Sequence, residues 1–463
     1  MKRFLYVILC ATFAMCGNIS HAFACTSTQI DTGSTCVDTK FTITTKNLSA
    51  NTSVSFYLTA TGTFYVDCGD GTLSGTGASG KTITRTSTSD SATYSCAYTS
   101  GGTKTIRMAG RATGYHSTNP TISFYAANEE TAAIDGSLGA IFPTLGQNSG
   151  QQPVFYRLFH SNTHLTSIPG NLFSGVTGAT DSMFKEAFYG CTGLTSIPEN
   201  LFGGVSGAAS NMFDGTFYGC TGLTSIPEKL FRGVSGSASS MFYRTFDGCT
   251  GLTSIPGKLF RGVSGGANSM FGRTFRGCTG ITSIPGNLFS GVTNAAENLF
   301  TSTFANCTNL TGYIPSSTFS GLVANHSPTA TAMWSSTFAG TNLDTSCPAK
   351  TTPYTTGYET AWADSTANGM TGEGRREIVA CNPPVILAMA SYVIGMYNDV
   401  DNSKQNKLTS SGANPNVILT GDSNGIVSSF TANNGVITVT RSNITLPVGS
   451  QTSTKRANIW TEQ

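Results

Sequence analysis

The sequence predicts a modular fold in three parts: an N-terminal all-β sandwich, a central solenoid of repeats, and a small α+β module near the C-terminal end. Three observations predict it. Residues 37–127 hold short runs of alternating apolar and polar side chains, residues 158–345 repeat a 29-residue unit, and residues 385–463 place an apolar stretch before several strand-like runs. A period of about 20 to 50 residues is typical of stacked units, each of which buries its apolar side only against its neighbours.

The first part of the chain, residues 1–24, is typical of a secretory signal peptide. Two basic residues precede a mostly apolar run over 4–16, and residues 22–24 form a small-x-small cleavage pattern. The mature chain would begin at Cys25, which leaves a lipid anchor open, although Ala22 stands where a lipobox usually has Leu. The sequence therefore predicts an exported protein, secreted or held at the cell surface.

Composition limits the partners of this chain. Charged residues make up 11% and the net charge is +2, whereas a nucleic-acid-binding protein would need a broad basic footprint. The longest later apolar run, 385–397, is shorter than the ~20 residues that a membrane-spanning helix needs. We therefore expect neither a nucleic-acid partner nor a transmembrane segment after the signal peptide.

Residues 25–127 are expected to form the sandwich, because runs such as 53–59 and 104–108 have the composition of short strands. The sequence Asp-Cys-Gly-Asp-Gly-Thr over 67–72, followed by the tyrosines of 94–98, resembles the D-x-G-D-G-T pattern of PKD-type modules. That resemblance implies a PKD/Ig-like fold. Asp67 and Asp70 favour a turn over a calcium site, since carboxylates in glycine turns commonly bond the local backbone. Residues 128–157 are predicted to be a linker or an N-terminal cap.

The repeat unit that begins at Phe217 predicts the architecture of residues 158–345. Residues 223–226 read Leu-Thr-Ser-Ile and are halted by Pro227, which predicts one short strand per unit in a parallel sheet. Residues 241–246 are expected to form short helical turns on the opposite side. The run Phe-Tyr-Gly-Cys-Thr-Gly-Leu-Thr-Ser-Ile-Pro resembles the leucine-rich repeats of bacterial surface proteins, particularly the BspA-like class, although this unit is longer than most of that class. The resemblance implies a leucine-rich-repeat solenoid and a surface location.

Thirteen cysteines fall into three groups. Two leave with the signal peptide, and six lie in sequence-adjacent pairs that are candidate disulfides in an oxidising compartment. These pairs are Cys25 with Cys36, Cys68 with Cys96, and Cys347 with Cys381. The other five occur once per repeat unit, at Cys191, Cys220, Cys249, Cys278 and Cys307. Stacked units would hold their Cβ vectors parallel, which is poor disulfide geometry, so we interpret this column as small buried hydrophobes in preference to a metal or redox site.

Basic side chains also recur at equivalent positions, and they are the candidate ligand-binding residues. They are Lys229 and Lys258, Arg232 and Arg261, Arg244 and Arg273, with Arg276 nearby. Stacking would bring like charges close together, which costs stability unless an anion or solvent screens them. Two interpretations stay open: solubilising positions in copied units, or a basic patch for an anionic glycan or an acidic protein surface.

The end of the chain predicts two further pieces. Residues 346–384 are expected to be a disulfide-closed cap. Residues 385–463 predict a helix over 385–397 and strands over 417–420, 426–430, 436–440 and 444–446, with a hairpin turn at 432–435. This order is loosely similar to the globular end of type IV pilins.

No catalytic motif stands in the sequence, and we predict neither an enzyme nor a cofactor. His160 and His164 have the spacing of a zinc pair, but the repeat places them in a turn, where capping-unit polar residues are the simpler interpretation. We expect an exported surface protein for adhesion or for recognition of a host, cell or matrix ligand, a protein or a glycan. The alternatives are a structural or assembly component of an envelope appendage and, more weakly, a carbohydrate-active enzyme whose catalytic partner lies elsewhere.

Overall fold

The computed structural model describes residues 25–343 apart from 90–91, 128–129, 149, 313 and 325–331, and also residues 429–433 and 436–440. The signal peptide, the Cys347–Cys381 pair, the cap over 346–384 and the helix over 385–397 lie outside the described residues. The chain divides into two compact units, one made of residues 1–350 and 354–382 and the other of residues 351–353 and 383–463.

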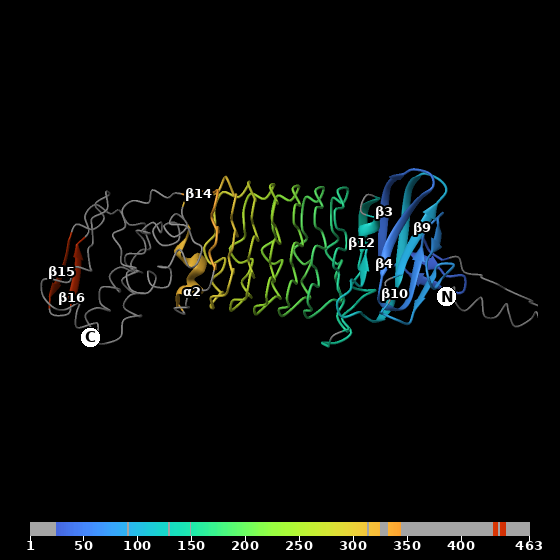
Figure 1. Cartoon of the computed structure of the whole chain (residues 1–463), viewed down its shortest axis with the longest axis horizontal. Helices are drawn as coiled ribbons and strands as arrows, with labels where there is room; N and C mark the ends of the chain where they lie inside the picture. Colours follow the sequence, from blue (N-terminus) through green and yellow to red (C-terminus); the bar gives the residue numbers. More distant parts are fainter. Residues whose placement is uncertain are drawn as a thin grey trace, which may run out of the picture. The chain divides into compact units, whose positions relative to one another are not determined.

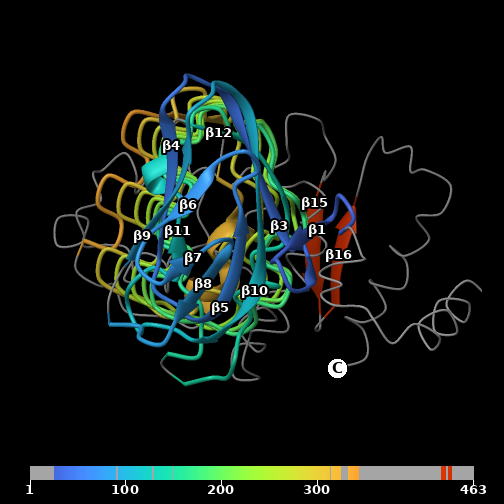
Figure 2. The ribbon, with the colours of Figure 1, turned by 90° about the vertical axis from the view of Figure 1, so that its right-hand side faces the viewer.

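The N-terminal part is a sandwich of two antiparallel sheets, as the alternating pattern predicted (Figures 1 and 2). The larger sheet has the order β12-β3-β10-β5-β8-β7 and the smaller has the order β11-β4-β9-β6. In β3 (Phe41–Leu48), alternate side chains such as Phe41 and Ile43 are buried, because successive residues of a strand point to opposite faces. The bounds of the other strands are β4 (Thr52–Leu58), β5 (Thr61–Asp67), β6 (Thr72–Ser74), β7 (Ala78–Ser79), β8 (Thr82–Arg85), β9 (Ala92–Tyr98), β10 (Gly102–Gly114), β11 (Ile122–Ser123) and β12 (Thr131–Gly136).

Two features extend or secure this sandwich. Strand β12 pairs with β3, so the sandwich continues past the predicted boundary at residue 127. A separate ribbon of β1 (Gln29–Asp31) and β2 (Cys36–Asp38) precedes it. The predicted disulfides Cys25–Cys36 and Cys68–Cys96 are both present, the first at this ribbon and the second joining the two sheets of the sandwich.

The prediction of a leucine-rich-repeat solenoid is wrong. Between β12 and β13 (Thr311–Gly312), the described residues contain neither strands nor α-helices, and the sheets are antiparallel apart from a two-residue parallel pairing of β13 with β14 (Asn342–Leu343). The segment predicted as the strand, 223–226, is joined to the next unit by a single backbone hydrogen bond, from Thr253 to Thr224, so no ladder forms. The helical elements described are η1 (Tyr125–Ala127), η2 (Ser316–Phe319) and α2 (Ser320–Ala324), none of them in the predicted place within a unit.

Tight turns take the place of the predicted helical side. In residues 182–191, alternate amides donate to the carbonyl three residues back, as Lys185 N does to Ser182 O, while the amides between them donate to the next unit, as Phe184 N does to Met212 O. Every fourth residue has a left-handed backbone, for example Ser182, Glu186 and Gly190 at φ of 59°, 53° and 68°. The same pattern recurs in 211–219, 240–248, 269–277 and 298–306, and residues 155–161 share its bonds to the next unit and its left-handed backbone at Arg157 and Ser161. We call these segments together the turn wall.

Phenylalanine rings fill the interior behind the turn wall. Equivalent rings of successive units stack nearly parallel, with centroids 5.5 Å apart for Phe242 and Phe271 and 5.7 Å apart for Phe246 and Phe275. A third column, which contains Phe231 and Phe260, packs against the first from the opposite segment, with Phe231 and Phe242 5.0 Å apart. Burial of these large rings, in offset and edge-on contact, stabilises the repeat together with the buried Leu, Ile, Val and Met side chains of each unit.

The sandwich closes the first repeat unit. The ring of Phe124 stacks on Phe159 at 5.3 Å, and Phe124 N donates to Leu158 O. Asn162 occupies the position of the repeat cysteine. Its Nδ2 donates to Thr131 O of β12, and its Oδ1 accepts hydrogen bonds from the amides of His164 and Leu165. Residues 128–157 therefore hold both the last strand of the sandwich and the entry to the repeat.

At the other end of the sequence, β15 (Ser429–Asn433) and β16 (Val436–Thr440) pair antiparallel, so the predicted hairpin is present and its second strand has the predicted bounds. The first strand extends through residues 432 and 433, which were predicted to lie in the turn. The rest of the predicted α+β module lies outside the described residues. Within the described part of the chain, no helix is long and apolar enough to cross a membrane.

Candidate binding surface

The turn wall sets which side chains of each unit reach the outside. In each group of four residues, two side chains enter the interior and the next two lie on the outer side, as Met241 and Phe242 precede Tyr243 and Arg244. Because the units stack in register, outer residues 29 apart form columns along the wall. Three outer columns carry most of the polar side chains. The first contains Tyr156, Lys185, Asp214 and Tyr243. The second contains Arg157, Glu186, Gly215, Arg244 and Arg273, and the third contains His160, Tyr189, Tyr218, Asp247 and Arg276.

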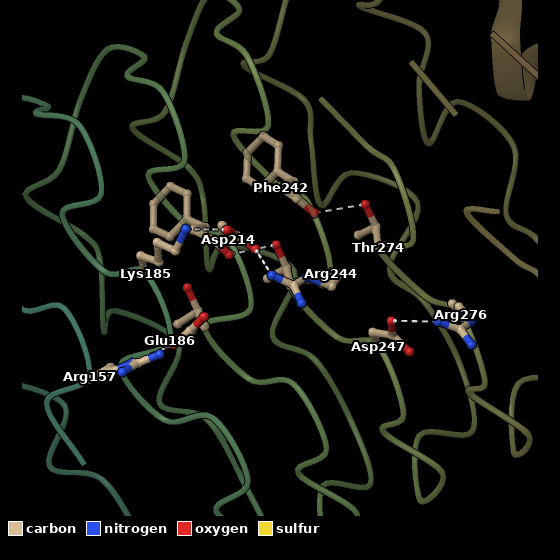
Figure 3. A network of polar contacts seen from close by, with 12 residues as sticks. Arg157, Lys185, Glu186, Asp214, Phe242, Arg244, Asp247, Thr274 and Arg276 are labelled. Atoms are coloured by element: carbon tan, nitrogen blue, oxygen red, sulfur yellow. Dashed lines mark hydrogen bonds and ion pairs between the residues drawn. The ribbon is translucent and has the colours of Figure 1, made fainter. Parts of the chain in front are cut away.

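Ion pairs link these columns from unit to unit (Figure 3). Arg157 Nε lies 2.7 Å from Glu186 Oε2. Asp214 is shared by two cations, with Lys185 Nζ at 2.9 Å and Arg244 Nη2 at 3.3 Å. Because the Asp214 side chain is only 4% exposed, these pairs are screened less by solvent than ordinary surface pairs.

Asp247 is held differently. Its side chain is 7% exposed, Arg276 Nη1 is 3.8 Å from its Oδ2, and that oxygen makes no hydrogen bond within the described chain. Burial raises the pKa of Asp247 to about 6, although Arg276, Arg273 and Arg244 all act to lower it. A buried carboxylate oxygen without a donor is costly, so this position has an unmet requirement for a hydrogen bond.

Aromatic side chains occupy the N-terminal half of the same column. His160 stacks on Tyr189 at 4.5 Å, and Tyr189 stacks on Tyr218 at 4.4 Å, with planes within 4° of parallel in both pairs. Tyr125 meets His160 edge-on at 5.1 Å. Rings and arginines therefore line one face of the repeat, which is the composition that protein binding surfaces favour.

The structure divides the seven predicted basic residues between two segments of the unit. Arg244, Arg273 and Arg276 lie on the turn wall, where the expected repulsion within a column is relieved because Arg244 reaches Asp214 and stacks on Tyr243 at 4.9 Å. The remaining four lie on the segment that carries Phe231, whose ring meets Phe242 across the interior. These four, Lys229, Arg232, Lys258 and Arg261, are therefore on a different side of the unit from the wall arginines.

The two lysines of that second segment are neutralised. Lys229 pairs with Glu199 at 3.0 Å and Lys258 pairs with Glu228 at 3.4 Å, and all four side chains are at least half exposed. Exposed pairs of this kind contribute little to stability. Arg232 and Arg261 are exposed, and neither has an ion pair within the described residues.

One constellation on the wall has the residue types of a hydrolytic triad. Ser161 Oγ lies 2.8 Å from His160 Nδ1, and His160 Nε2 lies 3.8 Å from Glu186 Oε2. Glu186 is already bonded to Arg157, and burial lowers the pKa of His160. The amide of Ser161 donates to Tyr189 O, so it is not free to stabilise an oxyanion as hydrolysis requires. The geometry is that of a surface hydrogen-bond network.

The two carboxylates of the sandwich turn are engaged by cations. Asp67 bonds Arg107 and lies 3.2 Å from Lys81, and Asp70 lies 2.7 Å from Lys104. Gly69 N also donates to Asp67, as the predicted turn motif requires. In the described residues, no group of three His, Cys, Asp or Glu side chains could hold a metal ion.

The cysteine column lies in the interior, away from this face. All five thiols are free and buried, and each donates to a phenylalanine carbonyl of the preceding unit, as Cys249 Sγ does to Phe217 O at 3.0 Å. Burial raises the pKa of each thiol. These are the properties of the small buried side chains that we predicted.

No protein-family model, curated protein or solved structure matches this chain. The resemblances to BspA-like repeats and to PKD-type modules therefore stay predictions.

Several residues of the wall escaped the sequence analysis. Lys185, Glu186 and Asp214 were not singled out, nor were the stacked tyrosines. The 29-residue period could have revealed them, because it places charged residues at equivalent positions of successive units: Arg157, Glu186, Arg244 and Arg273 share one column. Lys185 and Asp214 share another, one unit apart.

Proposed function

We propose that this chain is an exported binding protein that recognises an extracellular ligand through the outer face of the turn wall. The role would be adhesion to, or recognition of, a host, cell or matrix surface. The observation that carries the proposal is the wall itself, where stacked aromatic rings adjoin Arg244, Arg273 and Arg276.

Charge on the wall favours an anionic ligand. Toward its C-terminal end, Arg244, Arg273 and Arg276 face Asp214 and Asp247, and Asp214 is already shared with Lys185. Arg273 has no ion pair in the described part of the chain and contacts the ring of Tyr243 at 5.9 Å. Cationic side chains on an aromatic surface attract anions over several ångströms and fix orientation at contact.

The repeat offers substitutions that test this proposal with little risk to the fold. Arg273→Ser and Arg276→Ala copy Ser302 and Ala305, which occupy the same positions one unit later. A control that removes the same charge is Arg232→Ser with Arg261→Ser on the other segment.

The experiment measures binding of the mature chain to arrays of glycans and matrix proteins at two salt concentrations. We expect salt-sensitive binding that the wall double variant loses and the control double variant keeps. Equal loss in both variants would show a general charge effect, and loss only in the control would move the binding to the other segment. Absence of all binding would contradict the proposal and favour the assembly role in an envelope appendage.

A further inference from the structure

We propose that the place where the aromatic column ends is a subsite for one uronic acid residue of an acidic glycan. The subsite is formed by Tyr218, Asp247, Arg273 and Arg276, and we call it the column break. This inference rests on the proposed function, because it identifies the ligand that the turn wall would bind.

The ring of Tyr218 is the last of the stacked aromatic column and is partly exposed. Its preceding neighbour in the column, Tyr189, stacks on it at 4.4 Å, but the next position holds Asp247. No second ring and no cation stacks on Tyr218 within the residues that the structure describes. The flat apolar face of a sugar ring packs against an aromatic side chain of this kind, while the hydroxyls at its edge keep their polar partners.

Asp247 supplies an acceptor that lacks a donor. The carboxylate is more than nine-tenths buried, and its Oδ2 has no hydrogen bond, because Arg276 Nη1 at 3.8 Å is too distant to donate. Arg244 Nε, close by on the wall, is also buried without a partner. The Arg276 side chain is 41% exposed, so its displacement toward solvent would admit a ligand hydroxyl to Asp247.

The combination of charges selects the ligand class. A purely anionic group would be attracted by Arg273 and Arg276 but repelled by Asp247. A neutral sugar would bond Asp247 but would offer no anion to Arg273, which has no ion pair within the described residues. A uronic acid carries a carboxylate for the arginines, hydroxyl donors for Asp247 and a ring face for Tyr218, so it uses all three features.

The test is calorimetric titration of the mature chain with uronic acid oligosaccharides built on galacturonate, glucuronate and mannuronate. The comparison ligands are the same oligosaccharides after reduction of their carboxyl groups, and dextran sulfate as an anion without uronic acid. The variants are Tyr218→Ala, Tyr218→Phe and Asp247→Ala, with the Arg232→Ser and Arg261→Ser double variant as control. Ala305 shows that the wall accepts alanine at the position of Tyr218 and Asp247.

We expect at least one uronic acid series to bind and its carboxyl-reduced form to bind at least tenfold more weakly. Tyr218→Ala and Asp247→Ala should each weaken binding about tenfold, whereas Tyr218→Phe and the control should bind like the parent chain. Equal binding of dextran sulfate, unchanged by Tyr218→Ala and Asp247→Ala, would overturn the uronate subsite and leave anion binding by the wall intact. Failure of every uronic acid series to bind would also overturn it, while the array experiment would still decide the proposed function.

Discussion

Replacing Asp247 with asparagine should stabilise the protein at neutral pH. The charged carboxylate is buried, and its nearest cation, Arg276 Nη1, is 3.8 Å away, so desolvation exceeds the attraction of the arginines and raises the pKa from 3.8 to about 6. Each pKa unit corresponds to about 1.4 kcal/mol, so ionising Asp247 in the folded state costs about 3 kcal/mol at pH 7.5. Asparagine keeps the size of the side chain and removes that cost.

The pH dependence follows from the sign of this shift. The folded state holds the proton of Asp247 more firmly than the unfolded chain does. The protonated carboxyl therefore makes its whole contribution to the free energy of unfolding below about pH 4, and this contribution is lost as the pH rises through 6. Urea unfolding of both proteins at pH 4, 5, 6 and 7.5 should therefore show no advantage for Asp247→Asn at pH 4 and an advantage near 3 kcal/mol at pH 7.5. The charged groups that act on it are Arg244, Arg273 and Arg276.

A matched control lies one unit away on the same wall. Asp214 is equally buried but has Lys185 at 2.9 Å and Arg244 at 3.3 Å, so Asp214→Asn should destabilise by about 1 to 3 kcal/mol at pH 7.5. A loss of stability in Asp247→Asn at pH 7.5, or a difference from the parent chain that stays constant with pH, would refute the argument from desolvation.

Three further predictions test the repeat. Ser302 has a left-handed backbone, at φ 54°, so Ser302→Gly should stabilise the protein by up to about 1 kcal/mol, and Gly215→Ala at the equivalent position should destabilise it by a similar amount. Thermal unfolding that ranks the two variants the other way would contradict the left-handed turns. Phe242→Ala should cost about 3 to 5 kcal/mol in urea unfolding, because its ring contacts rings of both neighbouring units, and a cost below about 1 kcal/mol would rule out that packing. Cys249 and its equivalents should resist a thiol reagent until denaturant is added, since burial raises their pKa; rapid reaction in the native chain would contradict this.

The sandwich could be predicted because its strands follow a simple rule. In β3, side chains alternate between core and outside, and a period of two is visible in the sequence. The pairs Cys25–Cys36 and Cys68–Cys96 could be predicted because the two members of each pair follow one another in the sequence, outside the repeat that carries the other described cysteines. The strand β12 was missed because residues 128–157 look like a polar linker, and only pairing with β3 reveals its role.

The turn wall could not be predicted in the same way. Buried residues at 241, 242, 245 and 246 fit a helical period as well as they fit successive turns. The deciding feature is the left-handed backbone at every fourth residue, which falls on Arg244 and Glu186 as well as on glycine. Arginine and glutamate give no local signal of that conformation, so the helix prediction failed.

The predicted strand failed for a related reason. Residues 223–226 contain β-branched side chains, but backbone bonds between units are concentrated in the turn wall. The candidate basic residues were divided correctly into columns, yet the sequence could not show that a phenylalanine-filled interior separates Arg232 from Arg244. Nor could it show that Asp214 would bind two cations from different units.

The buried thiols bear on how the chain acquires its disulfides. In an oxidising compartment, five extra cysteines would compete with Cys68 and Cys96 for a partner during folding. Each unit that docks on its neighbour removes one sulfur from that competition, because the thiol becomes buried and the thiolate needed for exchange is disfavoured. Growth of the stack therefore protects the correct pairing in the sandwich, and a unit that fails to dock would release a thiol able to scramble it.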